Sequence, residues 1–198
     1  MTTHTTLEFY PRDYRVRRQQ TPLPGSPSAR RGGGPRGAVT GLSAAAARNL
    51  QFEARNLEGL TTLLHLTYPA VFPRDGEVVK RHWARLREWL TDQGVGGLWL
   101  LEFQARGAPH FMLFLNGRVD RDAVAARWDR IVGSGDPEHR GTGTRVERTR
   151  KPYAAAAYAV KFCEKHAQKQ VPPDYRSVGR MWGTFGGVRV RPHETLEG

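Results

Sequence analysis

Cysteine and long apolar stretches are what this chain lacks, and each absence excludes a class of protein. The 198 residues include a single cysteine, Cys163, which excludes an internal disulfide framework and a cysteine-rich zinc site. No apolar run approaches the roughly 20 residues that a membrane span needs. The N-terminal sequence also has no apolar signal region. We therefore expect a cytoplasmic protein with no membrane partner.

Acidic residues are also few compared with basic ones. The chain carries 31 Lys and Arg residues against 19 Asp and Glu residues, which gives a net charge of +12, and only five of the cations are lysines. An excess of this size predicts a polyanionic partner, and it favours nucleic acid over a membrane surface. The bias towards arginine suits bidentate phosphate contacts, although GC-rich coding explains it equally well.

Composition divides the chain into three parts. Residues 1–40 are rich in Pro, Gly, Ser and Arg and contain few aliphatic residues, which predicts a disordered basic arm. Two interpretations of this arm stay open: a tail with no role, and a non-specific DNA clamp that acts through counterion release. Residues 41–186 are expected to form the folded domain, and residues 187–198 a flexible tail.

The folded part alternates between helix and strand patterns. Strand patterns with β-branched and apolar residues cover 61–69, 98–104, 110–115 and 143–149. Helical spacing of apolar residues, with Ser43 as an N-cap and Gly94 as a terminator, covers 43–59, 77–94, 119–135 and 152–170. This order predicts an α+β domain with a central antiparallel sheet and helices packed on one face.

The second and third strands are expected to form a hairpin that carries candidate metal ligands. A loop over 105–109 would put Gln104 opposite His110 and Glu102 opposite Met112. Because alternate residues of a strand share a face, the side away from the core would hold an imidazole, a carboxylate and an amide. These ligands suit Mg²⁺ or Mn²⁺. A hydrogen-bonded surface pair of His110 and Glu102 would produce the same pattern.

Two other segments carry candidate site residues. In the strand at 61–69, His65 and Thr67 share a face that could border the same polar surface, although a satisfied, partly buried imidazole also explains His65. In the last helix, Tyr158 and Lys161 stand one turn apart, and Lys165 continues their stripe. A tyrosine followed by a lysine suits a nucleophile with a cation beside the phosphate that it attacks. An amphipathic helix with snorkelling lysines explains the stripe as well.

The segments LLHLTYP, PHFMLFL after LLEFQ, and YAVK on a later helix together resemble the three motifs of HUH-type endonucleases. This family includes the rolling-circle replication initiators of plasmids and single-stranded DNA phages, with relaxases and some transposases as relatives. The resemblance runs from about Thr61 to Lys165 and implies a ferredoxin-like or RRM-like fold. YAVKFCEK is similar to the phage-type pattern with two tyrosines one turn apart. Because Phe162 stands at the second position, the resemblance implies a single-tyrosine enzyme.

One position departs from the family. Its name comes from a His-hydrophobic-His sequence, whereas this chain has His110-Phe111-Met112, and a thioether is a poor ligand for magnesium or manganese. Three explanations stay open. Glu102, Gln104 and His65 complete the site, or metal binding is impaired, or Met112 is an engineered substitution.

The resemblance implies transesterification of single-stranded DNA. Tyr158 would attack a scissile phosphodiester, with Lys161 adding charge at the phosphate and Mn²⁺ or Mg²⁺ polarising it, and would leave a 5′-phosphotyrosine and a free 3′-OH. The implied partners are single-stranded DNA or a hairpin at a replication origin, and a helicase and polymerase of a bacterial or archaeal host. The residues assigned to DNA contacts are Lys165, Thr67, Arg106, Arg180 and Trp182.

Two alternative functions remain. A non-catalytic single-stranded DNA-binding module on the same fold would explain Met112 as a degraded metal site, with Trp182, Phe185 and Tyr175 stacking on bases. A transposase or relaxase would use the same chemistry, but relaxases usually place the tyrosine before the histidine motif, which is opposite to the order here.

Overall fold

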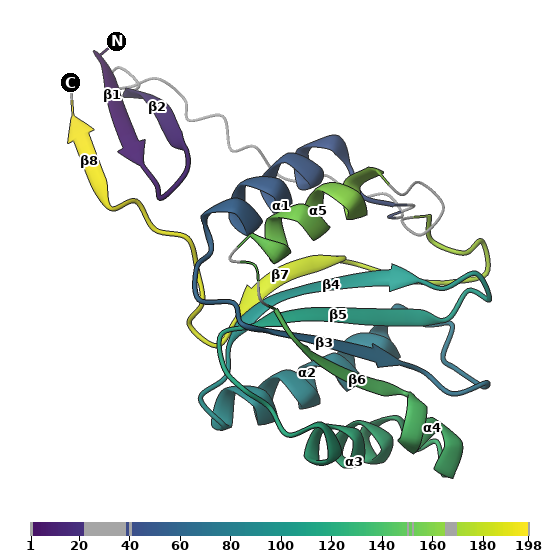
Figure 1. The fold of residues 1–198 in the computed structure, drawn as a ribbon. Coiled ribbons are helices and arrows are strands. Elements are labelled where there is room, and N and C mark those ends of the chain that lie inside the picture. Colours follow the sequence, from purple (N-terminus) through teal and green to yellow (C-terminus); the bar gives the residue numbers. More distant parts are fainter. Residues whose placement is uncertain are drawn as a thin grey trace. The chain divides into compact units, whose positions relative to one another are not determined.

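The computed structural model describes residues 2–21, 39, 41–149, 151, 153–164 and 170–197. The chain divides into two compact units, which are described separately (Figure 1). The smaller unit combines Met1–Ala38 with Val190–Gly198, and the larger unit is Val39–Arg189. Among the described residues, no helix is both long and apolar enough to cross a bilayer.

A five-stranded antiparallel sheet is the centre of the larger unit, with strand order β6-β3-β5-β4-β7 (Figure 1). The strands are β3 (Thr62–Thr67), β4 (Gly97–Phe103), β5 (Pro109–Leu115), β6 (Thr144–Arg148) and β7 (Trp182–Phe185). The predicted α+β class and the antiparallel sheet are confirmed. Strand β7 was not predicted, because Gly183 interrupts its short apolar alternation.

Local signals set the ends of the helices. The helices are α1 (Ala44–Asn56), α2 (Gly76–Asp92), α3 (Arg121–Val132), α4 (Pro137–Thr142) and α5 (Ala154–Glu164). The Ser43 hydroxyl caps α1 by accepting a hydrogen bond from the Ala46 N–H at 3.2 Å, as predicted. Asp120 caps α3 in the same way, and α3 ends at Gly133 in the left-handed region, with φ of 63°.

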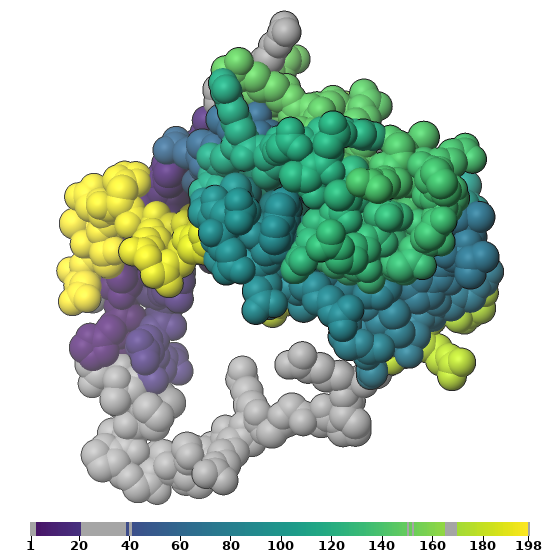
Figure 2. All heavy atoms as spheres, turned by 90° about the horizontal axis from the view of Figure 1, so that it is seen from below, coloured from purple at the N-terminus to yellow at the C-terminus, as the bar shows by residue number. Residues whose placement is uncertain are grey.

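Helices cover both faces of the sheet, which corrects the expectation of helices on one face. Helices α2 and α3 lie on one side, and α1 and α5 lie on the other (Figure 1). Seen from below, the blue-to-green segments of the first side form a continuous surface (Figure 2). The reason is in the strands: every residue of β4 is buried, and all of them except Glu102 are apolar or glycine, so both faces of the strand need a cover. The sequence pattern predicted an apolar face on one side of the sheet only and assigned the other side to the candidate metal ligands.

The α2 and α3 side contains the aromatic core. Trp83 of α2 stacks on Phe111 with ring centroids 5.6 Å apart, and meets Trp99 at 5.4 Å. Trp128 of α3 contacts Phe111 edge-on at 6.2 Å. On the opposite side, the strand residues Leu98, Leu100, Met112 and Phe114 are at most 2% exposed beneath α1 and α5.

The smaller unit is a three-stranded antiparallel sheet in the order β2-β1-β8. Its strands are β1 (Thr2–Phe9), β2 (Tyr14–Thr21) and β8 (Glu194–Glu197). These strands occupy parts of the segments for which the sequence predicts a disordered arm (1–40) and a flexible tail (187–198). In this sheet Leu7 pairs with Val16 on one side and with Leu196 on the other. The many arginines made the alternation of apolar and polar residues along these strands hard to recognise in the sequence. Residues 22–38 and 40 of the predicted arm lie outside the described residues.

Candidate functional site

The candidate site is a row of side chains that crosses the sheet on the α1 and α5 side. Glu102 of β4 lies directly opposite His110 of β5, and His110 lies opposite Thr67 of β3. Directly opposed residues of antiparallel strands project to the same face. Three neighbouring strands therefore bring a carboxylate, an imidazole and a hydroxyl together.

The strand register differs by two residues from the predicted one. Glu102 pairs with His110 and not with Met112, and Gln104 lies beyond the end of β4. The hairpin turns early because the Gln104 N–H donates to the Ala108 carbonyl at 2.9 Å, which closes the loop. A shift of two residues keeps every side chain on its predicted face, so Glu102 and His110 still share one surface.

Tyr158 of α5 lies over this row and contacts Glu102. Its phenol O–H donates to Glu102 Oε1 at 2.7 Å, across 56 residues of sequence. The Glu102 carboxylate is only 4% exposed. The Tyr158 ring also contacts Phe114 of β5, with ring centroids 5.8 Å apart. Burial, and then the hydrogen bond to Glu102, raise the pKa of Tyr158 far above its usual value.

A second row, next to the first, contains the methionine that departs from the family pattern. Across the sheet, this row runs through Trp182, Leu100, Met112, His65 and Arg145. The Met112 thioether is only 2% exposed. It packs in the sheet between Leu100 and His65, so its position is that of a core side chain.

His65 brings a second imidazole beside the first row. Its ring stacks with that of His110 at a centroid distance of 5.6 Å and an interplanar angle of 22°. His65 Nε2 lies 3.8 Å from Glu147 Oε1, and Arg145 Nε binds the same oxygen at 2.6 Å. Burial lowers the pKa of His65, and the Glu147 carboxylate opposes that shift. A lowered pKa favours the neutral imidazole, the form that can ligate a cation.

The donors in the first row fit a small divalent cation with few protein ligands. The described part of the chain contains no group of three or more His, Cys, Asp and Glu side chains placed to hold a metal ion. Mg²⁺ usually keeps several waters and is bound through one or two carboxylates together with substrate phosphates. Glu102 offers one such carboxylate, and the imidazole of His110 lies directly opposite it as a nitrogen ligand.

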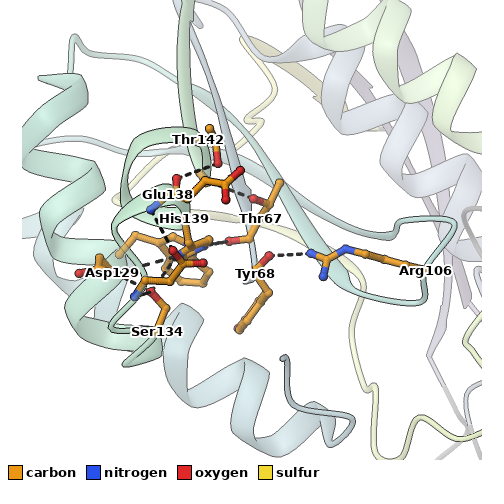
Figure 3. Close-up of polar contacts among 11 residues, drawn as sticks. Thr67, Tyr68, Arg106, Asp129, Ser134, Glu138, His139 and Thr142 are labelled. Carbon is orange, nitrogen blue, oxygen red and sulfur yellow. Dashed lines mark hydrogen bonds and ion pairs between the residues drawn. The ribbon is translucent and has the colours of Figure 1, made fainter. Parts of the chain in front are cut away.

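Gln104 and Arg106 have a different role from the predicted ones. Gln104 Oε1 accepts a hydrogen bond from Arg106 Nε at 2.9 Å. One terminal nitrogen of Arg106 donates to the Pro69 carbonyl at 2.7 Å. The other donates to the Tyr68 carbonyl at 2.6 Å (Figure 3). Arg106 therefore links the loop after β3 to the β4–β5 loop. Gln104 takes part in this link and does not join the row of Glu102, His110 and Thr67.

The remaining predicted DNA contacts are dispersed. Lys161 is exposed on α5 one turn after Tyr158, and Lys165 lies outside the described residues. Arg180 is exposed, and its backbone carbonyl accepts a hydrogen bond from Lys80. Trp182 is partly buried and ends the second row.

Two of the three aromatic residues proposed to stack on bases belong to the core. Tyr175 is 6% exposed and packs edge-on against Phe103, with ring centroids 4.8 Å apart. Phe185 is 7% exposed and meets Trp83 at 5.3 Å. Their burial leaves Trp182 as the accessible aromatic side chain of that set.

A buried polar network that was not predicted holds the end of β3 (Figure 3). The Thr67 carbonyl accepts hydrogen bonds from Trp128 Nε1 at 2.7 Å and His139 Nε2 at 2.9 Å. His139 Nδ1 lies 3.1 Å from Ser134 Oγ, which donates to Asp129 at 2.7 Å. The network therefore holds the backbone of Thr67, the last residue of β3, whose side chain shares a face of the sheet with His110. The sequence Asp136-Pro137, an N-cap followed by a proline in the first turn, indicates the start of α4, the helix that carries His139.

Comparisons with known proteins found no match to a family model, to a curated protein or to a solved structure. The class established by the structure is an α+β domain with a five-stranded antiparallel sheet. Inference about function therefore depends on the geometry of the site.

Proposed function

We propose that this chain nicks and rejoins single-stranded DNA with Tyr158 as the nucleophile and with Mn²⁺ or Mg²⁺, and that it initiates rolling-circle replication of plasmid or phage DNA. The observation that carries this proposal is the 2.7 Å hydrogen bond from Tyr158 to Glu102, which faces His110 on the next strand. A hydroxyl nucleophile, a carboxylate and an imidazole from three separate elements meet there. The resemblance implies Tyr158 and His110, and Glu102 comes from the strand pattern.

The protein's own residues supply the proton transfer. Because burial raises the pKa of Tyr158, the phenol keeps its proton in the resting site. As the phenol oxygen attacks phosphorus, the proton passes to Glu102, the acceptor already in contact. The new bond joins Tyr158 to the 5′ phosphate, and the bond to the 3′ oxygen breaks, with that oxygen taking a proton from solvent. The phosphotyrosine conserves the bond energy for rejoining.

Charge at the phosphate comes from two sources. A divalent cation held by Glu102 and His110 would supply positive charge against the scissile phosphate. Lys161, exposed one turn after Tyr158, adds a side-chain cation on the same helix. The net charge of +12 favours binding of the DNA strand itself. In this proposal, the strand or hairpin lies at a replication origin, and a host helicase and polymerase extend the free 3′-OH.

A binding module without catalysis is the second candidate, and the burial of Met112 favours it. With 2% exposure and a soft thioether, Met112 adds no ligand to Glu102 and His110. The same basic chain would then bind single strands without cutting them. Loss of Tyr175 and Phe185 to the core weakens this alternative, since base stacking supplies much of the affinity of such modules.

A covalent adduct separates the two candidates. The full chain is incubated with Mn²⁺ and a pool of single-stranded oligonucleotides that carry a 3′ label, because the phosphotyrosine retains the 3′ fragment. We expect a labelled protein band on a denaturing gel for the parent and none for Tyr158→Phe. Tyr153→Phe is the matched control, because Tyr153 is 51% exposed just before the same helix.

Two outcomes would contradict the nicking proposal. An adduct that persists in Tyr158→Phe assigns the nucleophile elsewhere. Retained oligonucleotide binding with no adduct from any variant supports the binding module.

A further inference from the structure

A cavity lies at the other end of β3 from the candidate nicking site, on the opposite face of the sheet. It has a volume of about 320 Å³ and is lined by Thr61, Thr62, Arg118, Val119, Val146, Glu147 and Arg148. Thr62 is the first residue of β3, whereas Thr67 in the Glu102 row is the last. A strand rises about 3.3 Å per residue, so these two positions are roughly 17 Å apart along β3. The cavity is therefore separate from the candidate nicking site and does not depend on the nicking proposal.

The floor of this cavity is apolar. Val119, in the segment before α3, and Val146, on the edge strand β6, are partly buried and pack against the aromatic core. Two branched side chains at the base of an open cavity give a surface on which a flat ring can lie. The volume is at the lower end of the range of small-molecule sites.

Two exposed arginines give the cavity its charge. Arg118 and Arg148 line it from different elements, and among the described residues neither forms an ion pair with a carboxylate. The carboxylate of Glu147 is bound on the other face of β6, where it pairs with Arg145 at 2.6 Å. Two guanidinium groups without local compensation favour an anion with several oxygens, and phosphate matches their planar donor geometry.

We propose that this cavity binds a nucleotide, with the base on Val119 and Val146 and the phosphate between Arg118 and Arg148. The apolar floor and the paired cations each match one half of such a ligand. The hydroxyl of Thr61, which is exposed at the rim, adds a neutral donor. The same chemistry fits a free mononucleotide and a nucleotide within a DNA strand.

Binding measurements on the full chain test this site. The probes are dAMP by calorimetry and a labelled oligo(dA) by fluorescence anisotropy. Loss of one guanidinium–phosphate contact weakens binding by about tenfold or more, so we expect this loss for Arg118→Gln and for Arg148→Gln. Arg87→Gln removes the same charge from an exposed position of α2 outside the cavity and is the matched control.

A second variant separates a shaped cavity from general attraction between charges. Thr61→Phe places a ring at the rim without changing the charge, and it should also weaken binding. If dAMP binding is lost in these variants, the cavity takes free nucleotides; if only oligo(dA) binding is lost, it holds a nucleotide of a strand. Equal losses in Arg118→Gln, Arg148→Gln and Arg87→Gln, or unchanged binding in Thr61→Phe, would overturn the proposal. None of these measurements needs Tyr158, so failure of the adduct experiment does not affect them.

Discussion

The hydrogen bond between Tyr158 and Glu102 can be measured by its effect on stability, independently of any DNA substrate. Tyr158→Phe removes the donor and leaves the carboxylate, which is 4% exposed, without this contact. A hydrogen bond to a charged group contributes about 1.5–3 kcal/mol to stability. We therefore expect Tyr158→Phe to lower the free energy of unfolding by that amount. For a protein of this size, the melting temperature should fall by roughly 3–12 °C.

A double-mutant cycle separates this bond from other effects of the substitution. Glu102→Leu removes the acceptor and leaves the phenol O–H without its partner, which costs about 1–3 kcal/mol. When both partners are replaced by apolar groups, neither penalty remains. The double variant should therefore be more stable than the sum of the single losses predicts, with a coupling energy of about 1.5–3 kcal/mol.

Urea denaturation, followed by the fluorescence of the buried tryptophans, measures the four free energies. Tyr153→Phe is the control, and its exposed phenol should change stability by no more than about 0.5 kcal/mol. Losses that add to within about 0.5 kcal/mol would show that the two residues do not interact in solution. The placement of Tyr158 over the Glu102 row would then be refuted.

Two other predictions concern the metal and the pH dependence of stability. Met112→His puts an imidazole next to His110 on the sheet, so Mn²⁺ binding by calorimetry should tighten, while the metal-free protein loses about 1–3 kcal/mol because the ring is buried; unchanged Mn²⁺ affinity would contradict this. Burial, and then the Arg180 guanidinium, lower the pKa of Lys80 from 10.5 to about 8, so the unfolded chain binds more protons between these values. Relative to Lys80→Met, the stability of the parent should therefore rise from pH 8 to 10.5 in thermal denaturation, and a flat difference would contradict the lowered pKa.

Features encoded by neighbouring residues could be predicted from the sequence. Ser43 and Asp120 cap their helices with their own side chains, and Gly133 ends α3 through a backbone conformation that glycine adopts without strain. The β4–β5 hairpin follows from two apolar runs separated by a short polar loop. Each of these signals lies within a few residues of the structure that it determines.

Features that depend on distant pairing could not be predicted in the same way. Leu7 pairs with Leu196, at the other end of the chain, and nothing in either segment specifies that partner. The register of the hairpin was missed by two residues because the Gln104–Ala108 hydrogen bond, and not the apolar pattern, decides where the strands turn. The second apolar face of the sheet was missed because two helices that are far apart in sequence cover it. Helix α1 precedes β3, and α5 follows β6.

The candidate site combines both kinds of information. Tyr158 and His110 were singled out from motif spacing, but the contact that joins α5 to the sheet is made by Glu102, which the motifs do not include. His65 was a weaker candidate, yet it lies directly opposite Met112 and its ring stacks with His110 at 5.6 Å. In an antiparallel sheet, opposed residues are closer to each other than residues two apart on one strand. A ligand missing from a strand motif should therefore be sought on the neighbouring strand, where pairing puts a replacement within reach.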